Sequence, residues 1–127
     1  MTSVRKLVED YYEHIDSGRL AEAAQLMTDD VLLTFANAEP VTGRDAATAS
    51  IQYVLDQCTS IEHSVFHWIE PHPAVDGTTE VLFEIRIQYY LKSGKELNIP
   101  GAVYATVDSD NKFTEQRLYG DLTQVFA

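Results

Sequence analysis

The sequence predicts an α+β fold in a single domain, residues 1–127, with helices first and a meandering antiparallel sheet after them. Up to about residue 57, apolar residues mostly recur every three or four positions, which is the period of an amphipathic helix. Beyond residue 61 the period becomes two, as in strands with one buried face. Short polar turns separate these runs. In an α+β arrangement of this order, the helices must cover one face of a curved sheet.

The first part of the chain predicts three helices and one short strand. The first helix begins near Val4 and ends at Gly18, and a shorter one spans about 19–27. A strand follows at 31–36, and after a turn-rich loop the third helix covers about 45–57.

Four strands are predicted in the second part, at 61–70, 79–92, 95–107 and 112–122. The last two gaps between them are short, and they hold residues that tolerate tight turns. Short gaps of this kind favour antiparallel hairpins.

Composition excludes several classes of partner. The formal net charge is -11 and the sequence pI is about 4.5, so the chain lacks the basic surface that nucleic acids or anionic membranes require. Cys58 is the only cysteine, which excludes an internal disulfide and fits a reducing compartment. We find no apolar run long enough for a membrane span and no secretory signal, and we expect a cytoplasmic protein.

One strand carries the most informative pattern. Between residues 80 and 91 the odd positions are apolar or aromatic, and the even positions include Glu84, Arg86 and Gln88. If this polar face lines a cavity, it offers an acid, a cation and an amide for small-molecule chemistry. If it faces solvent, these are ordinary surface residues.

Several local phrases make the chain resemble the SnoaL-like branch of the nuclear transport factor 2-like (NTF2-like) superfamily. They are Tyr11-Tyr12 ahead of residues 16–19, and the segments 27–31, 42–46, 61–63 and 117–122. The resemblance implies a cone-shaped fold, with three N-terminal helices packed in the concave face of a curved, mostly antiparallel sheet. It also implies a homodimer through the outer sheet face. Because this fold hosts isomerases, dehydratases, epoxide hydrolases, cyclases and non-catalytic binders, the function stays open.

The resemblance also implies which side chains face the pocket. By analogy with the family's steroid isomerases and epoxide hydrolases, the concave wall carries Glu84, Arg86, Gln88 and Tyr90, and the last strand adds Gln116, Leu118 and Gly120. The same analogy places Arg117, Tyr119 and Asp121 on the outer face or at its rim.

The known chemistries of these relatives match only in part. Tyr11 stands where the steroid isomerases have an oxyanion donor, but Phe35 and Val103 replace their two acidic groups. Arg86 matches an arginine of the epoxide hydrolases, whereas Gln88 and Leu118 replace their aspartates. Asp121 lies in a phrase typical of the polyketide cyclases, but its predicted direction makes it a poor match for their acid.

His63 and His67 lie four residues apart on the first long strand, so we expect them to share a face. At roughly 13 Å apart they are too distant to hold one metal ion. Either could move a proton near neutral pH, or simply be a hydrogen-bonded histidine at the pocket edge. No metal site is expected, because no third ligand has a suitable spacing. No cofactor is expected either, because the chain has no phosphate-binding loop or dinucleotide fingerprint.

The leading hypothesis is a cofactor-free acid–base enzyme, a cyclase, isomerase or dehydratase, that acts on a mainly apolar small molecule. Its candidate catalytic residues are Tyr11, Glu84, Arg86 and His67, and its candidate substrate-binding residues are Phe35, Tyr53, His63, Gln88, Tyr90 and Leu118. Glu84 and Arg86 could instead form a surface or dimer-interface ion pair, and the aromatic residues could be core. The rival function is a non-catalytic binding or dimerisation module, and a protein adaptor is a more remote alternative.

Overall fold

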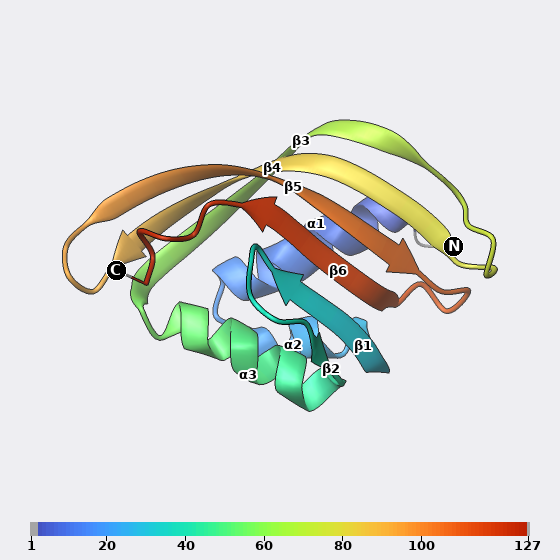
Figure 1. Cartoon of the computed structure of the whole chain (residues 1–127), viewed down its shortest axis with the longest axis horizontal. Helices are drawn as coiled ribbons and strands as arrows, with labels where there is room; N and C mark the ends of the chain where they lie inside the picture. Colours follow the sequence, from blue (N-terminus) through green and yellow to red (C-terminus); the bar gives the residue numbers. More distant parts are fainter. Residues whose placement is uncertain (1–2, 127) are drawn as a thin grey trace.

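The computed structural model describes residues 3–126 and shows a six-stranded sheet that arches over three helices (Figure 1). Along the chain the elements are α1 (Val4–Asp16), α2 (Leu20–Ala24), β1 (Met27–Phe35), β2 (Val41–Thr42), α3 (Arg44–Leu55), β3 (Cys58–Pro73), β4 (Thr79–Leu91), β5 (Glu96–Val107) and β6 (Phe113–Gly120). The strands lie in the order β2-β1-β6-β5-β4-β3, and every neighbouring pair is antiparallel except β1 and β6. The predicted α+β class is confirmed.

Helix α1 lies under the sheet and begins at a side-chain cap. The Ser3 hydroxyl accepts a hydrogen bond from the Lys6 backbone N–H at 3.1 Å, which satisfies one of the free donors of the first turn. The buried stripe consists of Leu7, Val8, Tyr11 and Ile15. The helix ends where the chain reaches Gly18, whose φ of +77° is easiest for glycine.

Strand β3 extends three residues beyond the predicted strand at each end, and the largest difference from the sequence prediction lies between the second helix and the first strand. The second helix ends at Ala24, and β1 begins at Met27, four residues before the predicted start of the strand. Pairing with a distant segment explains the change, because Met27 lies opposite Phe113 and the Phe113 N–H donates to the Leu26 carbonyl at 2.8 Å. Such tertiary pairing overrides the local helical period. The two-residue strand β2 was not predicted.

Strand β4 points its odd-numbered side chains into the core. Val81, Phe83, Ile85, Ile87 and Tyr89 are each at most 3% exposed. The even-numbered side chains therefore face outward, and the expected concave wall of even-numbered polar residues is wrong. The physical reason is the pattern itself: burying the apolar face is favourable, whereas burying the charged face would strip carboxylates and a guanidinium of water.

A bulge reverses the faces of β3 between its two histidines. His67 has a φ of +48°, and the pairing with β4 shifts register between Phe66 and Ile69. Beyond the bulge Trp68 stacks on the buried Phe83, with ring centroids 5.5 Å apart. His63 and His67 consequently lie on opposite faces of the sheet, which corrects the expectation that they share one.

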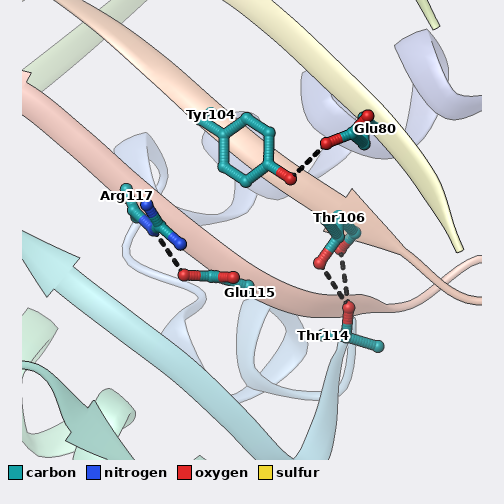
Figure 2. A network of polar contacts seen from close by, with 6 residues as sticks. All are labelled: Glu80, Tyr104, Thr106, Thr114, Glu115 and Arg117. Carbon is teal, nitrogen blue, oxygen red and sulfur yellow. Dashed lines mark hydrogen bonds and ion pairs between the residues drawn. The ribbon is translucent and has the colours of Figure 1, made fainter. Parts of the chain in front are cut away.

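On the face of the sheet away from the helices, polar side chains pair with one another across β4, β5 and β6. Figure 2 shows Tyr104 donating to Glu80 at 2.5 Å, and the Thr106 and Thr114 hydroxyls 2.5 Å apart. Arg117 forms an ion pair with Glu115 and lies over the Tyr104 ring. None of the helices in residues 3–126 is long and apolar enough to cross a membrane.

Candidate functional site

A cavity of about 60 Å³ lies between helices α1 and α3 and the inner face of the sheet. Among the lining residues that the structure describes, those with polar side-chain atoms are Tyr11, Tyr12, His63, Tyr89 and Gln116. The other twelve lining residues are apolar. In such an environment, electrostatic interactions are stronger than in water.

Two hydrogen bonds join Asp16 to His63, which lines this cavity. His63 Nδ1 lies 2.5 Å from Asp16 Oδ1, and the His63 backbone N–H donates to Asp16 Oδ2 at 2.8 Å. The His63 side chain is 9% exposed and that of Asp16 is 22% exposed. The pair joins the end of α1 to the first part of β3.

The position of Asp16 is unfavourable without its partner. It is the last residue of α1, where the helix dipole disfavours a negative charge. The two N–H donors of His63 offset that cost. The contact with His63 thus stabilises a carboxylate at a helix position that would otherwise disfavour its charge.

The contact also determines which nitrogen of His63 is available. An ionised carboxylate only accepts hydrogen bonds, so Nδ1 carries the hydrogen that faces Asp16. In the neutral ring the Nε2 atom then holds the free lone pair and can act as a base. The Tyr12 ring stacks on the imidazole, with centroids 4.6 Å apart and planes 23° from parallel. Stacking and hydrogen bonding together hold the ring in one orientation.

Both tyrosines of α1 stay protonated at physiological pH. Burial raises the pKa of Tyr11 above its usual range, and the adjacent Gln116 carboxamide opposes only part of that rise. Burial raises the pKa of Tyr12 well above its usual value, and the nearby Tyr11, Asp16 and Tyr89 raise it further. Their hydroxyl groups are therefore neutral hydrogen-bond donors at the cavity.

Gln116 on β6 contributes a buried amide. The residue is 6% exposed, and its Nε2 atom has no hydrogen-bond partner among the described residues. Strand β6 was predicted to point Gln116 and Leu118 inward, and both line the cavity.

A larger pocket of about 660 Å³ adjoins the cavity. It lies between the loop after β1, helix α3 and the C-terminal segment 120–126. The two spaces share Phe35, Val54 and Leu122, which we call the neck. At the rim the rings of Tyr53 and Phe126 stack with centroids 5.7 Å apart.

The structure brings together some of the predicted site residues. Tyr11, Phe35, His63 and Leu118 line the inner cavity, and Tyr53 lines the outer pocket. Their catalytic or binding roles remain predictions.

The other predicted site residues, Glu84, Arg86, His67, Gln88 and Tyr90, line neither space. His67 pairs with Glu84 on the outer face at 2.6 Å, with side chains 70% and 53% exposed. Arg86 donates to Asn98 at 2.6 Å, and Asn98 donates to Gln88 at 3.0 Å. The inward orientation expected for the four β4 residues is therefore wrong, because the apolar odd face of β4 occupies the core. The direction of His67, which the sequence leaves open, is outward because of the bulge.

Asp16 and Tyr12 were not predicted as site residues, and Gln116 was placed inward without a role. The sequence shows both residue types of a histidine–aspartate pair, but 47 residues separate His63 from Asp16, so the sequence does not indicate that they meet. Only the packing of α1 against β3 shows that they meet. In residues 3–126 no three His, Cys, Asp or Glu side chains gather in a way that could hold a metal ion.

The sequence pattern of the SnoaL-like domain family matches residues 8–116. The chain belongs to the SnoaL-like family. No curated protein sequence matches it closely enough to count as a relative. The family match and the structural likenesses below together support membership of the NTF2-like superfamily.

Solved structures share the fold of this SnoaL-like protein. A protein from Novosphingobium aromaticivorans, provisionally named a scytalone dehydratase, is 19% identical with a TM-score of 0.83, covering 93% of this chain and 81% of that one. The epoxide hydrolase/cyclase-like enzyme SalBIII of pyran ring formation is 13% identical, with a TM-score of 0.77 and coverage of 94% and 92%. The Orange Carotenoid Protein of Anabaena is 18% identical, with a TM-score of 0.73, over 89% of this chain and 35% of that one. At these identities the likeness shows the fold alone.

Proposed function

We propose that this SnoaL-like protein is a cofactor-free acid–base enzyme that isomerises, cyclises or dehydrates a mainly apolar small molecule. One observation carries the proposal: His63, which lines a mainly apolar cavity, is paired with Asp16 at an Nδ1 to Oδ1 distance of 2.5 Å. A histidine whose tautomer is held by a carboxylate is suited to proton transfer near neutral pH.

The reaction would proceed by moving one proton. His63 Nε2 takes a proton from a carbon beside a carbonyl group, and Asp16 stabilises the resulting imidazolium. Negative charge that develops on the substrate oxygen is met by the neutral hydroxyl of Tyr11 or Tyr12. His63 then returns the proton to another atom, which completes an isomerisation or a ring closure, or to a departing hydroxyl, which completes a dehydration.

The comparisons favour this class of chemistry. The neighbours include a provisional dehydratase and an epoxide hydrolase/cyclase-like enzyme, both on the same fold. Neither name identifies the substrate of this chain. The comparisons therefore support the type of reaction, and the Asp16–His63 pair is the argument specific to this chain.

A non-catalytic binding module is the second candidate. The carotenoid-binding neighbour has a domain of this fold and, by its name, binds canthaxanthin. The outer pocket of about 660 Å³ falls within the range of about 300–1,000 Å³ typical of ligand sites. A binder would use the same pockets without needing the proton-transfer geometry of His63.

A homodimer through the outer sheet face also stays a proposal. That face exposes Ile69, Leu82 and Tyr119 at 55%, 45% and 54%. Exposed apolar side chains of this kind are common at interfaces between subunits. Sedimentation of the wild-type protein and of a Leu82→Glu variant would test the proposal, and an unchanged monomer in both would contradict it.

The enzyme proposal is tested with β-tetralone, a neutral ketone whose α-hydrogens exchange with deuterium when a base removes them. In D₂O the wild-type protein should accelerate this exchange above the buffer rate, as followed by proton NMR. Asp16→Asn should reduce the protein-dependent rate by about 10²- to 10⁴-fold, because the amide no longer stabilises the imidazolium. The downfield imidazole N–H resonance of His63 should disappear in the same variant. Exchange at the buffer rate in the wild type would overturn the proposal and favour the binding module.

A further inference from the structure

Gln116 carries a buried amide nitrogen without a hydrogen-bond partner among the described residues. Its side chain is more than nine-tenths buried, and Nε2 finds no acceptor in the described part of the chain. A buried donor without a partner costs about 1–3 kcal/mol, and native proteins contain few of them. An apolar side chain of the same size would avoid that cost.

The neighbours of Gln116 offer its amide few acceptors. Across the sheet it lies opposite Ala105, which offers no side-chain acceptor. Tyr11, which also lines the cavity, lies close enough to the carboxamide for Gln116 to lower the pKa of its hydroxyl, although Nε2 has no acceptor within hydrogen-bond distance among the described residues. Gln116 thus belongs to the lining of the cavity that contains His63, and its unpartnered Nε2 atom lies buried within that wall.

The sizes of the two spaces restrict what can reach this amide. The inner cavity, at about 60 Å³, is far smaller than a ligand pocket, which typically measures about 300–1,000 Å³. The outer pocket is about 660 Å³ and meets the cavity at the neck of Phe35, Val54 and Leu122. A ligand that uses both must place a small group inside and its body outside.

The lining also restricts the charge of the inner group. Among residues 3–126 no Lys, Arg, Asp or Glu belongs to the lining of the inner cavity. A charged group there would lose its hydration without a counter-ion, which costs several kcal/mol or more. An uncharged acceptor oxygen would instead receive the free N–H of Gln116.

We infer that Gln116 Nε2 is the hydrogen-bond donor for an uncharged acceptor oxygen, a carbonyl or ether, on a small head group of the ligand, whose larger body occupies the outer pocket. This inference rests on the same site as the proposed function but does not need the site to be catalytic. It assigns Gln116 to ligand recognition and selects neutral oxygen-bearing molecules over carboxylates and amines.

A ligand-free measurement tests the first half of the inference. Gln116→Met keeps the size of the side chain and removes the unpartnered amide, so the urea midpoint of the variant should equal or exceed that of the wild type. Gln88→Met is the matched control, because Gln88 has a partner in Asn98 on the outer face and changes no cavity group. A clear loss of stability in Gln116→Met alone would show that the amide is structural and would overturn the inference.

A binding measurement tests the second half with β-tetralone and with tetralin, the hydrocarbon that lacks its carbonyl. On ¹⁵N-labelled protein, β-tetralone should move the Gln116 side-chain N–H₂ resonances downfield, and tetralin should not. Gln116→Met should weaken β-tetralone binding about five- to tenfold and leave tetralin binding unchanged. Equal binding of both compounds to the wild type, or an unchanged affinity for β-tetralone in the variant, would overturn the inference.

These outcomes separate the two proposals. If the amide resonances respond to β-tetralone but no deuterium exchange occurs, Gln116 is the recognition donor of a non-catalytic binder. If exchange occurs and the amide does not respond, the acid–base proposal stands and the role of Gln116 is wrong.

Discussion

Asp16 and His63 lie 47 residues apart in the chain and meet through two hydrogen bonds to the same carboxylate, one from the backbone and one from the imidazole. Because the backbone N–H is one of the donors, the position of the ring relative to α1 is determined by strand β3 itself. Packing of the helix against the strand and orientation of the imidazole are therefore one structural feature.

A second pair, His67 and Glu84, has nearly the same contact distance, 2.6 Å, but lies in a different environment. Its side chains are 70% and 53% exposed, against 9% and 22% for the first pair. Exposed pairs of this kind contribute little to stability, and water competes for their hydrogen bonds. The protein thus has two histidine–carboxylate pairs, one beside the cavity and one exposed to solvent, whose roles can be compared directly.

Changes on the outer face of β4 should leave activity intact. Glu84→Gln and Arg86→Met alter side chains that line neither pocket, so we expect deuterium exchange within about twofold of wild type and stability within about 0.5 kcal/mol. The exchange assay and urea denaturation measure the two quantities. A tenfold fall in exchange for either variant would mean that this face takes part in the reaction.

The inward orientation of the odd residues of β4 predicts unequal costs for two isoleucine truncations. Ile87→Ala empties space at the cavity wall, where Ile87 is 3% exposed, and should lower the free energy of unfolding by about 2–5 kcal/mol. Ile69→Ala removes a side chain that is 55% exposed and should cost less than about 1 kcal/mol. Urea denaturation of the two variants decides the matter, and equal losses would contradict the orientation.

Alkaline pH should weaken the fold through the buried phenols. The pKa values of Tyr11 and Tyr12 are raised in the folded protein, so above about pH 10 the unfolded chain loses protons that the folded protein still holds. Stability should therefore fall as pH rises beyond this point. Tyr11→Phe removes one such group. The free energy of unfolding of this variant, measured by urea denaturation, should decline less steeply between pH 9 and 11 than that of the wild type. An identical slope in the variant would exclude Tyr11 as a source of the effect.

Local patterns in the sequence predict the fold class and most element boundaries, because the periods of helices and strands follow from which faces are buried. They fail where a distant segment decides the structure. Met27 pairs with Phe113 and becomes part of β1, although the local period continues a helix. Pattern alone leaves the direction of β4 open, and the analogy with better-known relatives assigns the wrong face, against the cost of burying Glu84 and Arg86.

The site is less predictable than the fold for a related reason. A bulge at His67 has no clear signature in the sequence, yet it decides which histidine reaches the cavity. Asp16 becomes a candidate only once α1 is docked on β3. Tyr11, Phe35 and Leu118 could be anticipated because the resemblance to the NTF2-like superfamily implies that these positions face the pocket.

The most direct test of the account compares His63→Gln with His67→Gln in the deuterium-exchange assay on β-tetralone. Each variant removes one imidazole from a histidine–carboxylate pair, but only His63 lines the cavity. We predict that His63→Gln loses at least about 100-fold of the protein-dependent rate while His67→Gln stays within about twofold of wild type. Equal rates in the two variants, or a loss confined to His67→Gln, would contradict the assignment of the Asp16–His63 pair as the proton carrier.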